Sequence, residues 1–338
     1  MTYKCKKCLQ KCETKPEEYV IVTIDMAGAE LRIIAELANA ESWIRAFALG
    51  WDVHSVGTEI LYPKEWPALT EDGCLYFAKD EHGQPRRLKC SCKGHKKLRD
   101  KNKATNFLLC YGGGPPALAD ALGVSLDEAK ELYKLHESKF PDIWGYLKRS
   151  GELAKERKEA RDMFGRRRLF PPPTWESSKE WFMDEHAEDL ELEEEDCKAQ
   201  IFAFKSEHFR EPDADEEYRL THRPPTPQEI KWAMRGMMAS IERRGKNMCI
   251  QGTNASIIKR AMGCGFDKNG QPYLWHTLPL LKAKLLSMVH DELIVQCPKR
   301  FGKQVFEMVG DSFKRAAAEV MTKVVMEFDG HISDRWQK

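Results

Sequence analysis

The stretch Lys284-Leu-Leu-Ser-Met-Val-His-Asp-Glu-Leu-Ile-Val-Gln296 decides the fold. Two short runs of strand-forming residues flank its polar triplet, His290-Asp291-Glu292. This pattern predicts two strands joined by a tight turn. Adjacent carboxylates at a turn point in different directions, so one can bind a metal ion while the other takes a second role. Read alone, the triplet fits a polar turn on a surface hairpin equally well, and the rest of the chain must decide.

A second acid follows a second predicted strand. The apolar, β-branched run Tyr19 to Ile24 predicts a buried strand that ends at Asp25. Apolar residues at helical spacing from Leu31 to Ala38 then predict a helix whose first turn contains Glu30. An acid at the end of a buried strand is costly unless it binds a cation. The alternative is an aspartate that caps the helix.

Four residues spaced by four predict a functional helix face. They are Arg99, Lys103, Phe107 and Tyr111, followed by the helix-ending Gly112 to Gly114. Each step of four turns about 400°, so the four side chains drift only about 40° apiece. Two cations followed by two aromatics suit a triphosphate at one end and a base with its sugar at the other. The alternative is an amphipathic helix with lysine stems packed on aromatic rings.

Composition narrows the class of protein. The 338 residues contain 54 Lys and Arg and 53 Asp and Glu, but residues 86–103 are basic and residues 176–217 are acidic. A local basic stripe is what phosphate binding needs, so near-neutrality does not exclude nucleic acid. No apolar run is long enough for a membrane span and no signal peptide is visible, so we expect a cytoplasmic protein.

Eleven cysteines suggest thiols or metal ligands in a reducing compartment. Cys5-x-x-Cys8 is half of a zinc site, and Cys90 and Cys92 lie just before the predicted functional helix. With His95 and Cys12 as substitutes, these residues predict a structural Zn²⁺ that joins the N-terminus to the base of that helix. The alternative is free thiols on a lysine-rich surface, since Cys-x-Cys is a less common half-site.

The remaining stretches complete the predicted elements. Residues 117–160 predict two helices, the first with a capping box from Ser125 to Glu128. Residues 174–226 are acidic and bounded by prolines, which indicates a peripheral insertion with a helix near Asp184 to Ser206. Gln228 to Arg244 predicts a helix, Asn247 to Lys259 opens another, and Val305 to Met326 predicts a closing helix. Polar amides beside Gly252 suit groove contacts to a duplex.

Together, these stretches closely resemble the polymerase core of family A DNA polymerases, the bacterial DNA polymerase I class. Four motifs stand in the family's order: Asp25-Met-Ala-Gly-Ala-Glu30, Arg99-x3-Lys103-x3-Phe107-x3-Tyr111-Gly112, Arg243-x3-Asn247-x3-Gln251-Gly-Thr, and Val289-His290-Asp291-Glu292. His54 and Phe164-Gly-Arg166 also fit. Each motif is weak alone, but the ordered set, from about Tyr19 to the C-terminus, is specific.

The resemblance implies an α+β fold, with a palm of antiparallel sheet and helices, helical fingers, and no thumb in this chain. We expect a Cys-rich segment at 1–18, palm at 19–52, fingers at 53–173 with a Cys-containing excursion at 62–95, an acidic insertion at 174–226, and palm again at 227–338.

The resemblance also implies a DNA-templated DNA polymerase that adds dNTPs to a primer 3′-hydroxyl of primer-template DNA. Asp25 and Asp291 are then the ligands of two Mg²⁺ ions about 4 Å apart, with Glu292 beside them. Lys103 and Arg99 bind the triphosphate, and Lys103 serves as proton donor to pyrophosphate. The other expected nucleotide contacts are His54, Phe107, Tyr111 and Glu30, and the expected DNA contacts are Arg243, Asn247, Gln251 and His290.

Two departures from the family pattern matter. Met26-Ala-Gly-Ala replaces the usual aromatic-Ser-Gln-hydrophobic run, and only 24 residues precede Asp25. We therefore expect a second polypeptide that supplies the thumb, the upstream palm strands covering the sheet edge and an exonuclease, as in a split phage polymerase, with the acidic insertion as its docking surface. The alternative to a split polymerase is a truncated family member, and the resemblance implies the cytoplasm of a bacterial or phage-infected cell. An alternative function is a catalytically idle DNA-binding scaffold, against which the retained acids and Lys103 argue. A single-subunit RNA polymerase is a further alternative, against which Glu30 and His-Asp-Glu argue.

Overall fold

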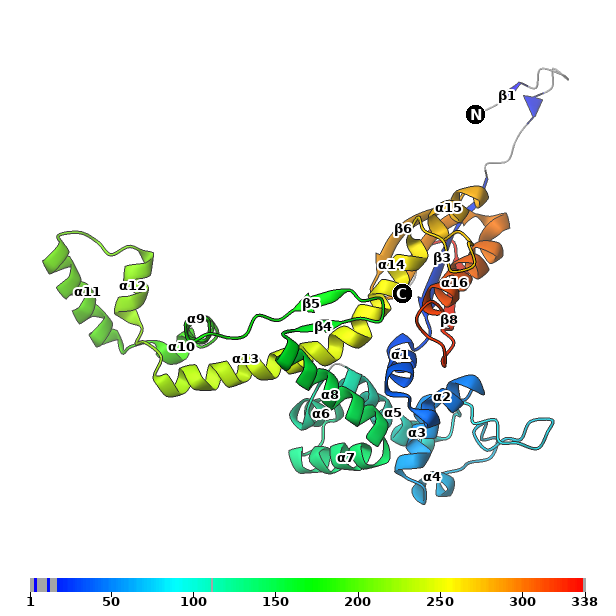
Figure 1. Ribbon diagram of the computed structural model, residues 1–338, viewed down its shortest axis with the longest axis horizontal. Helices are drawn as coiled ribbons and strands as arrows, with labels where there is room; N and C mark the ends of the chain where they lie inside the picture. Colours follow the sequence, from blue (N-terminus) through cyan, green and yellow to red (C-terminus); the bar gives the residue numbers. More distant parts are fainter. Residues whose placement is uncertain (1–2, 5–10, 13–16, 111, 337–338) are drawn as a thin grey trace. The chain divides into compact units, whose positions relative to one another are not determined.

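The computed structural model describes residues 3–4, 11–12, 17–110 and 112–336. The chain divides into two compact units (Figure 1). Unit 1 comprises Met1–Lys148, Arg161–Arg167 and Asn247–Lys338, and unit 2 comprises Arg149–Ala160 and Arg168–Lys246. Near the N-terminus, β1 (Tyr3–Lys4) pairs antiparallel with β2 (Lys11–Cys12).

A four-stranded antiparallel sheet forms the centre of unit 1. Its order is β6 (Lys284–Val289), β7 (Glu292–Pro298), β3 (Tyr19–Met26) and β8 (Phe328–Ser333). The predicted hairpin is confirmed, with His290 and Asp291 in its turn. The predicted strand before the first acid is also confirmed, and it runs one residue past Asp25. The α+β class is therefore confirmed.

The sheet corrects one expectation. We expected upstream strands from another polypeptide to cover the edge of the Asp25 strand, but β8 from the C-terminal end of this chain pairs with it. Gly330 permits this pairing, because a Cβ there would lie 2.1 Å from the carbonyl oxygen of Thr23. With β7 on one side and β8 on the other, β3 is an inner strand of the described sheet.

The closing helix is shorter than its apolar pattern predicts. Helix α16 spans Gly302–Ala317 and does not continue to Met326. The buried carboxylate of Glu36 accepts hydrogen bonds from the backbone N–H groups of residues 322–324, at 2.8 to 3.1 Å. These bonds replace those of a continued helix, so the segment turns and buries Met321 and Met326 in the core.

The sheet is covered by helices whose apolar faces contain the core. Val305, Val309 and Phe313 of α16 are fully buried, as are Ile33 and Ile34 of α1. Helix α1 spans Ala29–Ala38 and is followed by α2 (Glu41–Ala48) and α3 (Val53–Leu61). The π-helix η1 (Met248–Gly252) is followed by α14 (Thr253–Met262), α15 (Leu274–Thr277) and the 3₁₀ helix η2 (Leu278–Leu281). A second 3₁₀ helix, η3 (Lys299–Phe301), follows strand β7.

The rest of unit 1 is helical. Short α4 (Glu65–Ala68) precedes an irregular stretch, as expected, and then α5 spans Lys93–Cys110. Three helices follow where we predicted two: α6 (Pro115–Leu122), α7 (Leu126–Lys139) and α8 (Pro141–Arg157), whose residues from Arg149 on belong to unit 2. Gly123 at a φ of 62° ends α6, and Ser125 caps α7 by accepting from the Glu128 N–H, as its sequence predicts.

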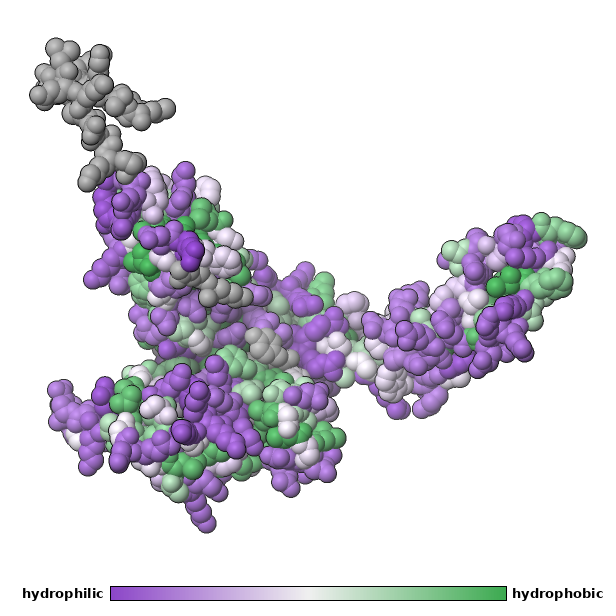
Figure 2. Space-filling model, turned by 180° about the vertical axis from the view of Figure 1, so that it is seen from behind, coloured by the Kyte–Doolittle hydropathy of each residue, from purple (hydrophilic) through white to green (hydrophobic). Residues whose placement is uncertain are grey.

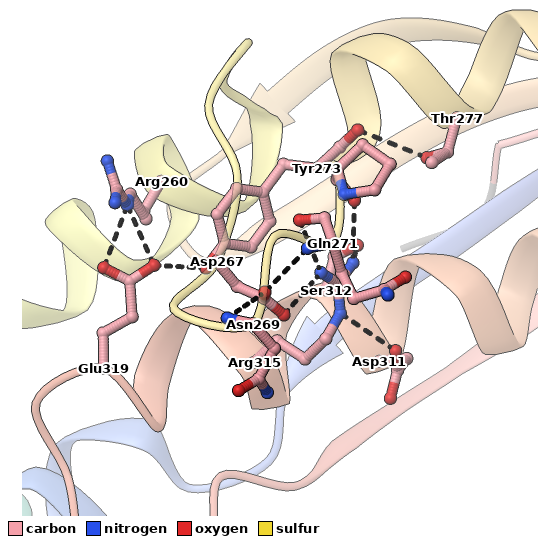
Figure 3. A network of polar contacts seen from close by, with 11 residues as sticks. Arg260, Asp267, Asn269, Gln271, Tyr273, Thr277, Asp311, Ser312, Arg315 and Glu319 are labelled. Carbon is pink, nitrogen blue, oxygen red and sulfur yellow. Dashed lines mark hydrogen bonds and ion pairs between the residues drawn. The ribbon is translucent and has the colours of Figure 1, made fainter.

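A polar network fixes the loop between α14 and α15 against α16 (Figure 3). Arg315 donates to Asp267 at 3.0 Å, and Glu319 accepts from Arg260 at 3.0 Å and from the Tyr273 hydroxyl. Asp267 in turn accepts the backbone N–H groups of Asn269 and Gln271. The charged groups are thus paired around the buried Tyr273. These pairs hold the loop in place although it contains no regular helix.

Unit 2 contains the acidic stretch and a long helix. The hairpin of β4 (Glu159–Arg161) and β5 (Arg167–Leu169) leads into it. Its helices are α9 (Trp175–Glu185), α10 (Ala187–Leu190), α11 (Glu194–His208), α12 (Ala214–Thr221) and α13 (Pro227–Asn247). Apolar surface is visible over α11 and α12 (Figure 2), where Phe202 is 73% exposed.

Candidate active site

A cleft in unit 1 gathers residues from four separate stretches of the chain. Its volume is about 650 Å³. It is lined by Asp25, Met26, Gly28 and Glu30 from the β3–α1 connection, Phe107 from α5, Gln251, Asn254 and Ala255 from η1 and α14, and His290 and Asp291 from the β6–β7 turn. Six of these are residues that the sequence singles out, and the fold brings them to one place.

Carboxylates converge at one end of the sheet. Asp25 lies opposite Glu292 in the β3–β7 register and opposite Asp329 in the β3–β8 register. Burial raises the pKa of Asp25, and the negative charges of Asp291, Asp329 and Glu292 raise it further. Oxygen ligands concentrated in this way suit a hard divalent cation, which would offset their mutual repulsion.

The hairpin turn and the C-terminal segment both contribute to the carboxylate cluster. His290 adopts a φ of 57° in the hairpin turn, the left-handed conformation that a tight turn requires. Glu292 accepts a hydrogen bond of 3.1 Å from the indole Nε1 of Trp336. Glu292 is thus already engaged by the C-terminal segment, in keeping with a role different from that of Asp291.

The sequence analysis missed Asp329. The pattern of Phe328 to Ser333 alternates in part between apolar and polar residues, which could have indicated a strand. The sequence analysis assigned no element to residues 327–338, because Gly330 interrupts the alternation there.

The residues of the predicted α5 face differ in their exposure and in the groups that they contact. Lys103 is exposed, with its ammonium 5.7 Å from the ring centroid of Phe107, and Phe107 is half-buried in the cleft. Arg99 is 9% exposed, and its guanidinium binds Asp52. Burial alone would raise the pKa of Asp52, but hydrogen bonds from Arg99 and Ser55 outweigh burial and lower it. Tyr111 lies outside the described residues.

His54 is buried at the N-terminal end of α3 and is held by a chain of hydrogen bonds. Trp144 donates to His136 Nδ1 at 3.0 Å, His136 Nε2 donates to Asn106 Oδ1 at 2.8 Å, and Asn106 Nδ2 donates to His54 Nδ1 at 3.2 Å. This order fixes the tautomer of His54, which keeps its proton on Nε2. Burial lowers the pKa of His54 to about 4 and that of His136 to about 3, so both rings are neutral at pH 7.

The sequence analysis missed Asn106 and His136. Asn106 lies within the spaced-by-four helix, one residue before Phe107, on its inward face. Its position three residues after Lys103 places it only about 60° from Lys103 around the helix, so helical spacing does not separate it from the cationic face. A buried amide of this kind cannot be distinguished from a solvated one by spacing alone.

The predicted duplex-contacting residues lie around a π-helix. Gln251 lines the cleft from η1, and Asn247 ends α13 with its Oδ1 buried and without a hydrogen-bond partner in the described residues. Arg243 belongs to unit 2 and is not among the residues that line this cleft. Single π-turns are frequent at functional sites.

Asp162 holds the π-helix in place and was also missed. It is 5% exposed, accepts the backbone N–H groups of Phe164 and Arg166, and accepts the Ser256 hydroxyl of α14 at 2.5 Å. Arg166 donates to the carbonyl oxygen of Gly252 at 3.0 Å. The basic turn thus contacts the helix junction beside Gln251, and Asp-x-x-Gly is the turn signal that could have indicated it.

The predicted thiol ligands are divided between described and undescribed residues. Cys90 and Cys92 lie together with His95, which the sequence analysis offered as a substitute, and with Cys74, which it did not assign. Cys5 and Cys8 lie outside the described residues. The four-residue cluster is complete without them, because Cys74 approaches from the loop after α4.

Comparison with known proteins places these features in a family. The sequence model of DNA polymerase family A matches residues 89–338. DNA polymerase I of Bacillus caldotenax is 22% identical over 331 residues, which cover 98% of this chain and 27% of that protein. The thermostable DNA polymerase I of Thermus filiformis is 21% identical over 308 residues, which cover 91% of this chain and 26% of that protein.

A solved structure has the same fold. The POL domain of Pol1 from M. smegmatis, in complex with DNA primer-template and dNTP, superposes with a TM-score of 0.60 at 20% identity. The match covers 96% of this chain and 41% of that one. The chain spans about a quarter of the length of the curated relatives named above. Within the described residues, no helix is both long and apolar enough to cross a bilayer.

Proposed function

Because this chain belongs to DNA polymerase family A, we propose that it extends a primer 3′-hydroxyl with deoxynucleoside triphosphates on a DNA template. One observation carries the proposal: the cleft contains Asp25 from strand β3 and Asp291 from the β6–β7 turn together with Phe107 of α5. Carboxylates for metal ions and an aromatic ring for a base then line a single space.

Asp25 and Asp291 are the residues that would hold two magnesium ions. The donor set fits, because hard oxygen ligands are clustered, and burial followed by the charges of neighbouring carboxylates raises the pKa of Asp25. When bound, magnesium supplies charge neutralisation at the triphosphate and lowers the pKa of the primer hydroxyl. Asp329 adds a third carboxylate to the same end of the sheet, and Glu292, hydrogen-bonded to Trp336, would serve the primer side of the site.

The helix α5 would bind the incoming nucleotide. Lys103 is exposed beside Phe107, so its ammonium can neutralise triphosphate oxygens and donate a proton to the departing pyrophosphate. Phe107 would stack on the base, and His54, neutral and protonated on Nε2, can donate a hydrogen bond to a phosphate oxygen. Glu30, with Tyr111, would exclude a ribose 2′-hydroxyl. Arg99 supports this face through Asp52.

The duplex would be contacted by Gln251 and His290, which line the cleft, and by Asn247 and Arg243 along the same helical stretch. Amide side chains suit the acceptors of the minor groove. A second polypeptide that supplies a thumb and exonuclease, and a phage source, stay predictions. Because β8 pairs with β3, an uncovered edge of β3 is no longer a reason to expect a second polypeptide.

Primer extension by the purified chain tests the proposal. We expect extension of a labelled primer with dNTPs and Mg²⁺, and little with rNTPs. Matched reactions with a Lys103→Met variant should be at least about tenfold slower, because a proton donor contributes on the order of 10²-fold. Extension with rNTPs would instead indicate an RNA polymerase. Tight DNA binding without extension, alone or with cell extract from the source, would indicate a scaffold.

A further inference from the structure

Three thiols and an imidazole meet in the fingers, away from the cleft. The Sγ atoms of Cys74, Cys90 and Cys92 and a ring nitrogen of His95 all lie within 4.8 Å of one another. Cys90 Sγ is 3.1 Å and Cys74 Sγ is 3.7 Å from His95 Nδ1. In a tetrahedral site with Zn–S of about 2.3 Å and Zn–N of about 2.0 Å, neighbouring ligand atoms lie about 3.5 to 3.8 Å apart. The cluster therefore needs only small adjustments to accept an ion at its centre.

The imidazole is oriented for coordination. His95 Nε2 lies 2.7 Å from the carbonyl oxygen of Trp66, an acceptor, so Nε2 carries the proton. Nδ1 then presents its lone pair to the three sulfurs. A backbone carbonyl that holds the distal N–H is the usual outer-shell partner of a metal-binding histidine. The ring also stacks on Trp66, with centroids 3.9 Å apart, which fixes its plane.

Burial of the four residues argues against the alternative of free thiols on a lysine-rich surface. The four residues are between 1% and 8% exposed, so the cluster is shielded from solvent. Residues 69–92 form only an isolated bridge between Lys79 and Pro85, and a stretch of this length with so little regular structure is uncommon unless something closes it. A metal clip that closes a long loop stabilises it most, because the loop entropy is lost from the unfolded chain.

We propose that Cys74, Cys90, Cys92 and His95 bind one structural zinc ion that fastens the irregular stretch to the first turn of α5. Three thiolates and one imidazole in a closed tetrahedral set are typical of structural zinc, and an iron–sulfur cluster would call for four thiolates. Each thiol releases its proton on binding. The ion lies at the opposite end of α5 from Phe107, so its role is to hold the helix start.

Metal content and cobalt spectra test the site independently of polymerase activity. The full chain, purified without chelator, should contain about one zinc per chain. Replacement by Co²⁺ should give the intense visible bands and near-ultraviolet thiolate bands of a tetrahedral three-sulfur site. Cys92→Ser should lose the zinc, whereas Cys297→Ser, an equally buried thiol on β7, should keep it.

Two further variants exclude other sources of metal. The double variant Cys5→Ser/Cys8→Ser should keep the full zinc content, because the four ligands are complete without the N-terminal pair. Cys264→Ser, at an exposed thiol, should also keep it. Absence of stoichiometric zinc from the wild-type chain after zinc supplementation would overturn the proposal, as would an octahedral cobalt spectrum. Loss of zinc from Cys5→Ser/Cys8→Ser with retention in Cys92→Ser would assign the metal elsewhere.

Discussion

Arg99 binds Asp52 through two parallel hydrogen bonds, Nε to Oδ2 at 2.6 Å and Nη2 to Oδ1 at 2.8 Å. The same carboxylate caps α3 by accepting from the Ser55 N–H at 3.0 Å. Arg99 therefore joins α3 to α5, next to His54, and Lys103 is the exposed cation of the predicted face. Arg99, which its spacing assigns to phosphate binding, is therefore buried and forms an ion pair with Asp52.

Removal of Arg99 should destabilise the fold more than removal of Lys103. Arg99→Met leaves the half-buried Asp52 carboxylate without its cation, and the lost charge-assisted hydrogen bonds cost about 1.5–3 kcal/mol. Lys103→Met should change the free energy of unfolding by less than about 0.5 kcal/mol, because its side chain is exposed. Urea denaturation of both variants measures this difference. Equal midpoints for the two variants would show that the ion pair contributes nothing particular.

The carboxylate cluster should cost stability in the absence of metal. Asp291→Asn removes one of the charges that raise the pKa of Asp25, so the metal-free protein should become more stable by about 1 kcal/mol, or ~2 °C in Tm. The same variant should lose the rise in Tm that Mg²⁺ gives the wild type, and primer extension with it. Thermal scans with Mg²⁺ and with EDTA measure both effects. Asp120→Asn, on the exposed face of α6, is the control and should behave like wild type. A metal-free Asp291→Asn protein less stable than wild type would contradict the repulsion.

Phe107→Tyr should ease dideoxynucleotide incorporation. Phenylalanine at this place in the spaced-by-four motif resembles family members that discriminate against dideoxynucleotides, and a tyrosine hydroxyl supplies the polar contact that a missing 3′-hydroxyl leaves out. The measurement is the ratio of dideoxy to deoxy incorporation on one template. Phe170→Tyr, at a phenylalanine outside the residues that line the cleft, is the control. An unchanged ratio would mean that Phe107 does not face the sugar.

Stability should fall in mildly acidic solution because of two buried histidines. The folded-state pKa values of His54, about 4, and His136, about 3, lie below the ordinary value of 6.5, so the unfolded chain binds more protons as the pH falls. Their contribution is complete above pH 6.5 and is lost as the pH falls to about 4 for His54 and to about 3 for His136. At about 1.4 kcal/mol per pH unit and proton, His54 alone accounts for ~3 kcal/mol.

The histidine effect can be isolated by substitution. His136→Gln keeps a polar group beside Trp144 and Asn106 but does not titrate, so the decline of unfolding free energy between pH 6.5 and 4.5 should be shallower. His208→Gln, at an exposed histidine of α11, should leave the slope unchanged. Denaturation at several pH values gives both slopes. If His136→Gln and wild type decline in parallel, His136 is not neutral when buried.

Gly330→Ala should separate β8 from the sheet. The added Cβ would lie 2.1 Å from the Thr23 carbonyl oxygen, and the φ of 156° strains any side chain, so we expect a loss of about 3 kcal/mol or more. Gly145→Ala, where a Cβ of α8 meets nothing within 4 Å, should instead be neutral or stabilising by up to about 1 kcal/mol. Denaturation measures both. A tolerated Gly330→Ala would mean that β8 can shift its register.

The sequence carried the local structure that its periodicity encodes. The hairpin around Asp291 and the helix with Lys103 and Phe107 follow from alternation, spacing and turn residues, and the structure has both. The end of α16 does not follow, because its apolar pattern continues to Met326 and only the distant Glu36 carboxylate offers the backbone a different set of hydrogen bonds. The strand β8 was missed because Gly330 interrupts its alternation and its partner, β3, lies at the other end of the sequence.

By itself, the sequence determined which residues bear the chemistry: two acids at strand ends, an exposed lysine and an aromatic ring at fixed helical spacing, and an ordered set of four motifs. Tertiary structure alone decided which of them share a space and which serve the fold. Asp329 joins the carboxylates, Arg99 pairs with Asp52, and Cys74 joins Cys90 and Cys92 beside His95. The physical reason is that periodicity is a property of a dozen neighbouring residues, whereas ion pairs, strand order and buried clusters depend on groups tens to hundreds of residues apart, whose encounter no local pattern records.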